Sequence, residues 1–552
     1  MKGVLISDFS INNLSGYLTN DTAEPKVTCV IAPFNQVHQV LMDKNMECWK
    51  GADFVVVWTQ PEKALKQFDL FLNNEKINIS DLLKEVETFA DLIISASASV
   101  KIMFVTTWTV DTVLNYSGLS DTQPNIGAGN VLAQMNKILA DKLWSTPNVY
   151  LLDSARWIDN HSYNPKLWYL TKTPFNNDVF SKAAQSTKSA LRTILGTTKK
   201  LIVVDLDNTL WGGVVGDVGY ENLKLGGHDA EGEAYKDFQL SLKAFVNKGI
   251  LLAVASKNEE TVAMEAIDKH PEMILSKKDF SSLKINWNDK VKNIVEISEE
   301  LNLGLDSIVF IDDNPHERAR VREALPQIFV PELPEDPLLY KQFLLGLNCF
   351  NSFMISDEDR KRTKLYAEEK GRVENKKEFQ DIEEWLASIN IQVTIEKVNK
   401  GNCQRVLQLL NKTNQMNLQT NRYTQQELEE FVRVDNRDVF TFSVSDKFGD
   451  AGLVGIASVI YESPKAVLND FVISCRVMGR KLEEIMLHTC IEAAKNKSCK
   501  MLSAQYIPTE KNKPCFDFFK YSGFKLSETI FEWDLKNTYV IPAYVIRKVV
   551  EF

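Results

Sequence analysis

Three short apolar runs in the middle of the chain each end in polar residues, and this feature most restricts the fold. They read KLIVVDLD at 200–207, ILLAVASK at 250–257 and SIVFIDD at 307–313, with helix-like patterns between them. Alternating strand and helix patterns are typical of a parallel sheet covered by helices. In doubly wound folds of this kind, a site forms outside the carboxyl ends of the strands. We therefore predict a central doubly wound α/β domain whose polar clusters meet at one edge of the sheet.

The rest of the chain divides around this block. With 552 residues, the chain is too long for a single hydrophobic core. Before the block, runs such as VTCVIAP and DFVVVW alternate with long helical patterns, which indicates a second parallel α/β sheet. After a proline-rich stretch at 331–337 and a charged, helix-like segment, half-exposed strand patterns with a few helices indicate an α+β domain. We predict a multidomain α/β protein with domains at 1–195, 196–350 and 391–552 and a helical connector at 351–390.

The composition excludes several classes of protein. Lys and Arg number 64 against 74 Asp and Glu, and the net charge of −10 gives no general attraction to nucleic acid or to an anionic membrane. No apolar run approaches the roughly 18 residues of a membrane helix, and the N-terminal residues lack the apolar centre of a signal peptide. The eight cysteines include no CxxC pair and have no histidine at zinc spacing. We expect a cytoplasmic protein without nucleic-acid or membrane partners and without structural zinc.

Two aspartates one residue apart follow the first apolar run. Alternation along the strand end places Asp205 and Asp207 on the same side, and Thr209 follows at the same spacing. One interpretation is that these aspartates cap the next helix. Asp312 and Asp313, however, stand at the end of another predicted strand. Carboxylates from two strand ends repel each other unless a hard cation holds them, and oxygen ligands favour Mg²⁺.

In these motifs the chain closely resembles the haloacid dehalogenase superfamily of phosphotransferases. The resemblance implies that Asp205 is the nucleophile that becomes an aspartyl phosphate, and that Asp207 is the general acid and then the base for water. It also implies two groups of binding residues: Thr209, Ser256, Lys257 and Lys290 for the phosphoryl group, and Asp205, the backbone carbonyl of Asp207, Asp312 and Asp313 for Mg²⁺. Which of Asp312 and Asp313 contacts the metal directly stays open, with Asp313 slightly favoured.

The spacing between these motifs predicts an open site. In this superfamily, substrate choice comes largely from cap domains inserted between the motifs. Only 51 residues separate Asp205 from Ser256 and 34 separate Ser256 from Lys290, which leaves little beyond the helices that the sheet needs. The glycine-rich segment at 211–227 has two interpretations, a small flap over the phosphate or a turn-rich hairpin without substrate contact. An open site suits a phosphate on something large, or help from another domain.

Longer stretches resemble the FkbH-like family, subfamily IIIC of the same superfamily, over nearly the whole chain. They are DLDNTLWGGVVGD, NLGLDSIVFIDDNPHERARVREALP, NKTNQMNLQTNRYT and SCRVMGRKLEE. The resemblance implies an N-terminal domain like SGNH hydrolases and a C-terminal domain like GNAT acyltransferases. It further implies removal of phosphate from 1,3-bisphosphoglycerate and loading of the glyceryl unit onto the phosphopantetheine thiol of an acyl carrier protein. The alternative is a simple phosphatase, acting on a small molecule or a phosphoprotein, whose outer domains bind partners.

The predicted C-terminal domain contains a strand, a basic glycine loop and a helix at 470–494. Backbone amides of such a loop at a helix N-terminus bind phosphate groups. Arg476, Gly479 and Arg480 fit the acyltransferase pattern except that Lys481 replaces its last small residue, which disfavours ordinary acetyl-CoA but suits a phosphopantetheine arm. Asn512 resembles a further position of that family. The alternative for the loop is a plain capped helix.

Acyl transfer needs a thiol, because Asp205 attacks phosphorus rather than the acyl carbon. Either the carrier's own thiol attacks directly or a cysteine of this chain holds the acyl unit first. Cys475 is the better candidate because positive charge and helix amides next to it would lower its pKa, and Cys515 comes second. The competing interpretation is that Cys475 is a small buried strand residue.

The predicted N-terminal domain matches the SGNH pattern loosely. Its candidate residues are Ser7 or Ser10 for the nucleophile, Gly129 and Asn130 for the oxyanion, and Asp159 with His161, one residue too close. Because these matches are loose, we expect a non-catalytic scaffold.

Overall fold

The computed structural model describes residues 1–111, 118–159, 161–351, 381–413, 415–474, 477–509 and 511–550, with positions 365, 366, 368, 372, 375 and 379. Two compact units are present, and each is described by itself. One comprises Met1–Arg192 with Thr424–Glu429, and the other comprises Thr193–Tyr423 with Glu430–Phe552. Within the described part of the chain, no helix combines the length and the apolar character that a membrane span requires.

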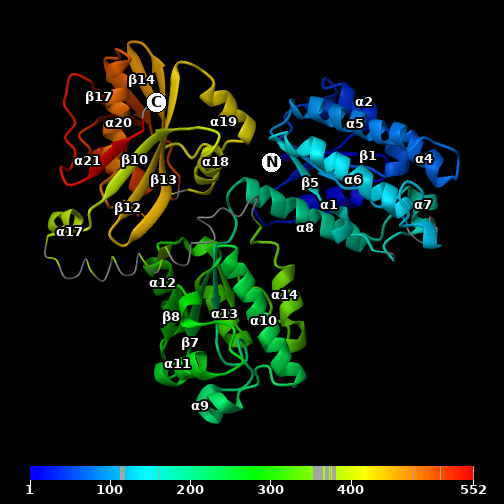
Figure 1. The fold of residues 1–552 in the computed structure, drawn as a ribbon, viewed down its shortest axis with the longest axis horizontal. Coiled ribbons are helices and arrows are strands. Elements are labelled where there is room, and N and C mark those ends of the chain that lie inside the picture. Colours follow the sequence, from blue (N-terminus) through cyan, green and yellow to red (C-terminus); the bar gives the residue numbers. More distant parts are fainter. Residues whose placement is uncertain are drawn as a thin grey trace. The chain divides into compact units, whose positions relative to one another are not determined.

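The first unit contains a parallel five-stranded sheet in the order β2-β1-β3-β4-β5. Its strands are β1 (Lys2–Ser7), β2 (Thr28–Ile31), β3 (Phe54–Trp58), β4 (Ile102–Thr106) and β5 (Val149–Leu152). The long helices α5 and α6 lie side by side in Figure 1. Every residue of β3 and β4 is buried, as expected where helices cover both faces of a parallel sheet. The helices are α1 (Asn12–Asn20), α2 (Val37–Met42), α3 (Pro61–Ala64), α4 (Lys66–Leu72), α5 (Ile79–Ser97), α6 (Ala128–Trp144), α7 (Pro165–Thr171) and α8 (Asn177–Ile194).

The second unit begins with a parallel four-stranded sheet in the order β8-β7-β6-β9. These strands are β6 (Leu201–Val204), β7 (Leu251–Ser256), β8 (Ser282–Ile285) and β9 (Ile308–Ile311). Alternate residues of β6 enter two hydrophobic clusters: Ile202 and Val204 pack with residues of α10 and α11, and Leu201 and Val203 with residues of α12 and α13. The helices are α9 (Val215–Val218), α10 (Ala230–Asn247), α11 (Glu260–Lys269), α12 (Lys290–Glu300), α13 (Pro315–Ala324) and α14 (Tyr340–Gly346). The predicted doubly wound core is confirmed.

The C-terminal region forms a mixed nine-stranded sheet, which confirms the predicted α+β class. Its main path is β16-β17-β15-β14-β13-β12-β10-β18, and β11 pairs with β14. The strands are β10 (Gln392–Lys397), β11 (Met416–Asn417), β12 (Arg437–Asp446), β13 (Gly449–Glu462), β14 (Lys465–Ile473), β15 (Met501–Gln505), β16 (Lys525–Ser527), β17 (Ile530–Asp534) and β18 (Ile546–Val549). The helices are α17 (Ile382–Ser388), α18 (Cys403–Lys412), α19 (Gln425–Val432), α20 (Leu482–Asn496) and α21 (Lys513–Tyr521).

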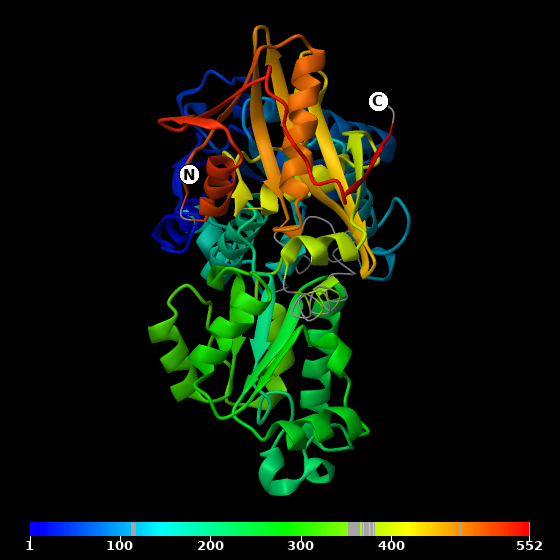
Figure 2. The same ribbon diagram turned by 90° about the vertical axis from the view of Figure 1, so that its left-hand side faces the viewer.

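The centre of this sheet differs from the half-exposed pattern that the sequence suggests. Residues 453–459 of β13 are buried without interruption, and consecutive strand residues point to opposite faces. Both faces of β13 are therefore covered. Figure 2 shows the orange helix α20 lying along the sheet, and α18 also packs on β13.

Candidate functional site

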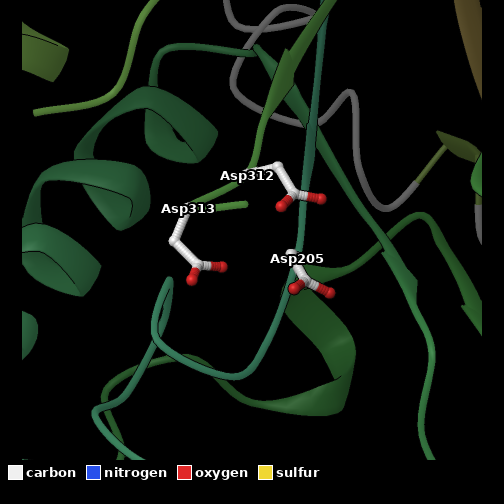
Figure 3. A group of neighbouring side chains, drawn as sticks. All are labelled: Asp205, Asp312 and Asp313. Carbon is white, nitrogen blue, oxygen red and sulfur yellow. The ribbon is translucent and has the colours of Figure 1, made fainter. Parts of the chain in front are cut away.

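Three carboxylates meet at the carboxyl edge of the four-stranded sheet. β6 and β9 are parallel neighbours with Val204 opposite Ile311, so the residues that follow them lie side by side. The backbone N–H of Asp205 continues this pairing by donating to the carbonyl of Ile311 at 3.0 Å. Ligand oxygens of Asp205, Asp312 and Asp313 all lie within 4.8 Å of one another, and Figure 3 shows the three side chains converging. The predicted strand-end cluster is confirmed as a candidate acidic metal site.

A single lysine lies among these carboxylates. Lys290, the first residue of α12, places its Nζ 2.6 Å from Asp312 Oδ2 and 3.1 Å from Asp205 Oδ1. Burial alone would lower the pKa of Lys290, but Asp205 and Asp312 more than offset this and raise it. Burial first, and then the charge of Asp205, raises the pKa of both Asp312 and Asp313. Lys290 thus pairs with two of the three crowded carboxyl groups, Asp205 and Asp312.

The donor atoms fit a hard divalent cation. Asp205 Oδ1 is buried, and the ammonium of Lys290 lies 3.1 Å from it without the geometry of a hydrogen bond. Lys290 also pairs with Asp312, so a further cation would add to the compensation that buried carboxylates need. Carboxylate oxygens without sulfur or imidazole donors are the ligand set of Mg²⁺ and similar ions. Asp205, Asp312 and Asp313 are therefore suited to hold such an ion together.

Asp207 is held by a separate set of donors. Its Oδ1 accepts from Trp211 Nε1 at 2.8 Å and from the backbone N–H of Val215 at 3.1 Å, and its Oδ2 accepts from Asn258 Nδ2 at 2.8 Å. Burial raises the pKa of Asp207 even though these three bonds oppose the shift. The carboxylate of Asp207 is not in the three-carboxylate group, and a metal contact through its backbone carbonyl stays a prediction.

Thr209, Ser256 and Lys257 have different surroundings. The Thr209 hydroxyl is fully buried, accepts from the backbone N–H of Asp313 at 3.2 Å and lies 3.4 Å from its carboxylate, so it ties the two motifs together. Ser256 is buried at the end of β7, the strand next to β6. Lys257 Nζ pairs with Glu317 Oε1 at 2.6 Å. Phosphate binding by these residues stays a prediction.

The structure adds two site residues that the sequence analysis missed. Asn258 contacts Asp207, and the polar run SKN at the strand end already contained the signal for it. Arg318, in α13, donates from its NH1 to the carbonyls of Asp312 at 2.8 Å and Asp313 at 2.7 Å. No local pattern indicated this arginine, because its bonds depend on how α13 packs against the end of β9.

The glycine-rich segment after the first motif is a folded excursion rather than an open flap. An antiparallel bridge joins Gly212 to Lys224, and α9 lies between them. Four apolar residues anchor the segment in the core: Trp211, Val215, Leu223 and Leu225. The segment therefore resembles the predicted hairpin more than the predicted flap. Trp211 and Val215 also donate hydrogen bonds to Asp207, a contact that neither interpretation predicted.

Comparisons with known proteins agree with this geometry. Residues 7–191 match the family model described as FkbH, N-terminal domain. A crystal structure of the N-terminal part of the protein BF1531 from Bacteroides fragilis, containing a phosphatase domain complexed with Mg, is 30% identical with a TM-score of 0.58. The alignment covers 64% of this chain and 94% of that chain. This chain belongs to the FkbH-like family. No curated protein matches it.

The FkbH-like chain therefore contains a haloacid dehalogenase-type phosphatase domain. Two acetyltransferase structures align with 26% of the chain: the ribosomal-protein-S18-alanine N-acetyltransferase of Escherichia coli at 9% identity and TM-score 0.22, and a GNAT-family enzyme of Staphylococcus aureus at 13% and 0.21. Likenesses at this level carry no information about activity.

Two polar groups of the predicted pantetheine loop of the FkbH-like chain have partners within the protein. Cys475 and Arg476 lie outside the described residues. Gly479 has a φ of +76° and donates its N–H to Glu483 Oε1 at 3.0 Å. Arg480 is buried, with its NH1 3.3 Å from Asp446 Oδ2. The loop's role in binding a pantetheine arm stays a prediction.

Asn512 and Cys515 are buried inside the same domain. The amide oxygen of Asn512 accepts from Tyr506 OH and from the backbone N–H of Thr509, each at 2.7 Å. Its Nδ2 donates to the carbonyls of Asn417 and Ile507. Burial raises the pKa of the Cys515 thiol far above its usual range, so this thiol is a poor nucleophile.

The N-terminal candidates have the following contacts. Ser7 and Ser10 line a cavity of about 310 Å³ beside Phe9 and Phe34. Asp159 Oδ1 accepts from the backbone N–H of its near neighbour His161 at 2.8 Å. Gly129 N–H donates to Asp121, and Asn130 accepts from Gln134. The scaffold interpretation of this domain stays a prediction.

Proposed function

We propose that the FkbH-like chain is a Mg²⁺-dependent phosphohydrolase in which Asp205 is the nucleophile. The observation that carries this proposal is the group of three carboxylates, Asp205, Asp312 and Asp313, whose ligand oxygens lie within 4.8 Å of one another at the strand ends. The Mg in the similar Bacteroides fragilis structure supports the choice of ion. Asp205, Asp312 and Asp313 would hold it, and the bound ion would neutralise phosphate charge and polarise a phosphoryl oxygen.

The chain's own residues account for two balanced steps. In the first, an Asp205 oxygen forms a bond to phosphorus while the bond from phosphorus to the leaving oxygen breaks, and Asp207 gives its proton to that oxygen. In the second, Asp207 takes a proton from water as the water oxygen attacks phosphorus. The bond between phosphorus and Asp205 then breaks, releasing phosphate. The raised pKa of Asp207 suits a group that must carry a proton near neutral pH.

Lys290 is placed to stabilise the transferred group. Its Nζ lies 3.1 Å from Asp205 Oδ1, an oxygen of the proposed nucleophile. Negative charge spreads over the phosphoryl oxygens in the transition state, and a fixed ammonium group there lowers the barrier. We propose that Ser256, at the end of the neighbouring strand, donates a hydrogen bond to the same oxygens.

For the substrate, we propose a phosphorylated three-carbon acid such as 1,3-bisphosphoglycerate, with an acyl carrier protein as acceptor. Membership of the FkbH-like family, with its N-terminal domain over residues 7–191, supports this choice. In acyl transfer, a thiolate attacks the carbonyl carbon of the acyl phosphate and the carbon–oxygen bond to phosphate breaks. The thiolate belongs to the carrier or to Cys475.

A second candidate is a simple phosphatase, of a small molecule or a phosphoprotein, whose outer domains bind partners. The engaged groups of Gly479, Arg480 and Asn512 favour it, because each already has partners within the C-terminal domain. Under this alternative the chain releases phosphate but transfers no acyl group.

Intact-protein mass spectrometry separates the two. The full chain is incubated with Mg²⁺, 1,3-bisphosphoglycerate and candidate carrier proteins, and the carriers are weighed. A carrier heavier by one glyceryl unit supports acyl transfer; phosphate release with every carrier unmodified supports the simple phosphatase. A Cys475→Ala variant that still loads the carrier at the wild-type rate leaves direct attack by the carrier's thiol.

A further inference from the structure

The carboxyl group of Asp207 receives three hydrogen bonds from two segments that are far apart in the sequence. Two come from the excursion after the first motif, from Trp211 Nε1 and the Val215 N–H, and one comes from Asn258 after β7. The side chains of Trp211 and Asn258 are 0% and 4% exposed. These groups fix the carboxyl plane of Asp207 from both ends.

Trp211 reaches Asp207 because the chain folds back sharply between them. Asn208 has a φ of +53°, its Oδ1 accepts from the Gly213 N–H at 2.9 Å, and a bridge pairs Asp207 with Trp211. A buried indole N–H needs an acceptor, since leaving it without one is costly. Asp207 Oδ1 is that acceptor. Trp211 therefore anchors the excursion in the core and also bonds directly to the carboxyl group of Asp207.

The bonds are distributed unequally over the two oxygens. Oδ1 accepts from two N–H groups, whereas Oδ2 accepts from one. An oxygen that already faces two donors has no room for a proton of its own, because that proton would point at another donor. Oδ2 is therefore the oxygen with a position left for proton exchange.

We propose that Trp211 and Asn258 are positioning residues that hold Asp207 with Oδ2 as the oxygen that exchanges the proton. This inference rests on the proposed phosphohydrolase function. In the first step, the bond between Oδ2 and its proton breaks and the proton passes to the leaving oxygen as that oxygen departs from phosphorus. Trp211 and Asn258 act through Asp207 in this scheme: Trp211 contacts Oδ1 and Asn258 contacts Oδ2, and neither contacts phosphorus or the leaving oxygen.

The test uses two phosphate esters that differ in their need for that proton. The leaving group of glycerol phosphate departs as an unstable alkoxide unless it receives a proton. The leaving group of p-nitrophenyl phosphate departs as the stable p-nitrophenolate anion. The value measured is kcat/KM, which reports the chemistry up to transfer onto Asp205 and not the later hydrolysis step that both esters share.

We expect Trp211→Phe to lower kcat/KM for glycerol phosphate about 100-fold, the low end of general acid catalysis. For p-nitrophenyl phosphate the loss should stay below about tenfold, because that leaving group needs little protonation. Asn258→Ala should likewise lower kcat/KM more for glycerol phosphate than for p-nitrophenyl phosphate. Asn258→Ser keeps a hydrogen-bond donor, so its kcat/KM for glycerol phosphate should fall less. Trp157→Phe is the matched control: it removes another buried indole N–H, bonded to Ser186 Oγ at 2.8 Å in the first unit, and should change neither value.

Equal losses for the two esters in both the Trp211 and the Asn258 variants would overturn the inference. If Trp211→Phe fails to fold, the comparison of Asn258→Ala with Asn258→Ser tests the inference by itself. A wild-type protein that hydrolyses neither ester with Mg²⁺ would instead contradict the proposed function, so the two failures are distinguishable.

Discussion

The edge of the phosphatase core and the loop before α20 are the two regions that the sequence predicts as ligand sites, but their polar atoms have different contacts. In the core, three carboxylates cluster at the strand ends, and Lys290 pairs with two of them, Asp205 and Asp312. In the C-terminal loop, Gly479 N–H is occupied by Glu483, and Arg480 is paired with Asp446. A motif shows which polar groups are present, whereas a ligand site also needs groups that the protein itself leaves unsatisfied.

Replacing the nucleophile should give the largest effect. Asp205→Asn keeps the shape of the side chain but cannot form the aspartyl phosphate, and we expect phosphate release to fall by at least about 10⁴-fold. Phosphate release and intact mass measure the outcome. Asp268→Asn, an exposed position on α11, is the control and should retain activity. A phosphorylated Asp205→Asn protein that forms at the wild-type rate would show that another residue is the nucleophile.

Removing the metal should have the next largest effect. We expect excess EDTA to abolish turnover and Mg²⁺ to restore it. Because binding relieves repulsion among the carboxylates, Mg²⁺ at about 100 times its Kd should stabilise the protein by about 2.7 kcal/mol, seen as a higher Tm. Asp312→Asn should reduce this gain. Full turnover in EDTA would contradict the metal site and weaken the contrast between the two regions.

The C-terminal network should respond in stability rather than in catalysis. Asn512→Ala leaves the buried hydroxyl of Tyr506 and three backbone groups without their partner, and we expect a loss of about 3 kcal/mol in unfolding free energy. Denaturant unfolding measures it, while hydrolysis of p-nitrophenyl phosphate should stay unchanged. Asn537→Ala, at an exposed position, is the control. A stable Asn512→Ala protein that fails only in carrier loading would indicate a binding role instead.

The smallest effect concerns Glu483 and has a defined pH dependence. Burial raises the pKa of Glu483, although the Gly479 N–H and Lys481 oppose the shift. The native state thus keeps a proton that the unfolded chain loses above its ordinary pKa of about 4.3, so this stabilisation is lost as the pH rises through the native pKa. Glu483→Gln keeps an acceptor for Gly479 and removes the titration. We expect its Tm to exceed that of the wild type by a few degrees near pH 7 and to match it near pH 4. A wild-type advantage at pH 7 would mean that the charged carboxylate stabilises the loop.

The acidic site was predictable because parallel strands end at a common edge. The apolar runs before Asp205 and Asp312 predict strands, and the hydrophobic pattern predicts the helices that cover them. In the sheet order, β6 lies between β7 and β9. The pairing of β6 with β9 brings Asp312 and Asp313 next to Asp205. The resemblance to a known superfamily supplied this pairing where local pattern alone did not.

The partners of individual polar atoms were not predictable. Asn258 stands beside two residues that were chosen as phosphate ligands, and Glu483 lies in the helix whose N-terminus was expected to bind phosphate. Arg318 supports two carbonyls of the acidic pair from the following helix. The bond from Asn258 to Asp207 joins segments 51 residues apart, and side-chain direction across such a gap depends on packing rather than on sequence spacing.

The sequence by itself determined the order of strands and helices, the two α/β sheets with their α+β successor, and the strand ends at which the aspartates stand. Local hydrogen bonding and the periods of apolar residues carry that information over a few residues at a time. Only the tertiary structure decided which polar atoms remain free for a ligand and which the protein engages. That outcome depends on contacts between segments far apart in the chain, such as Asn258 with Asp207 and Asn512 with Asn417, and no local pattern encodes them.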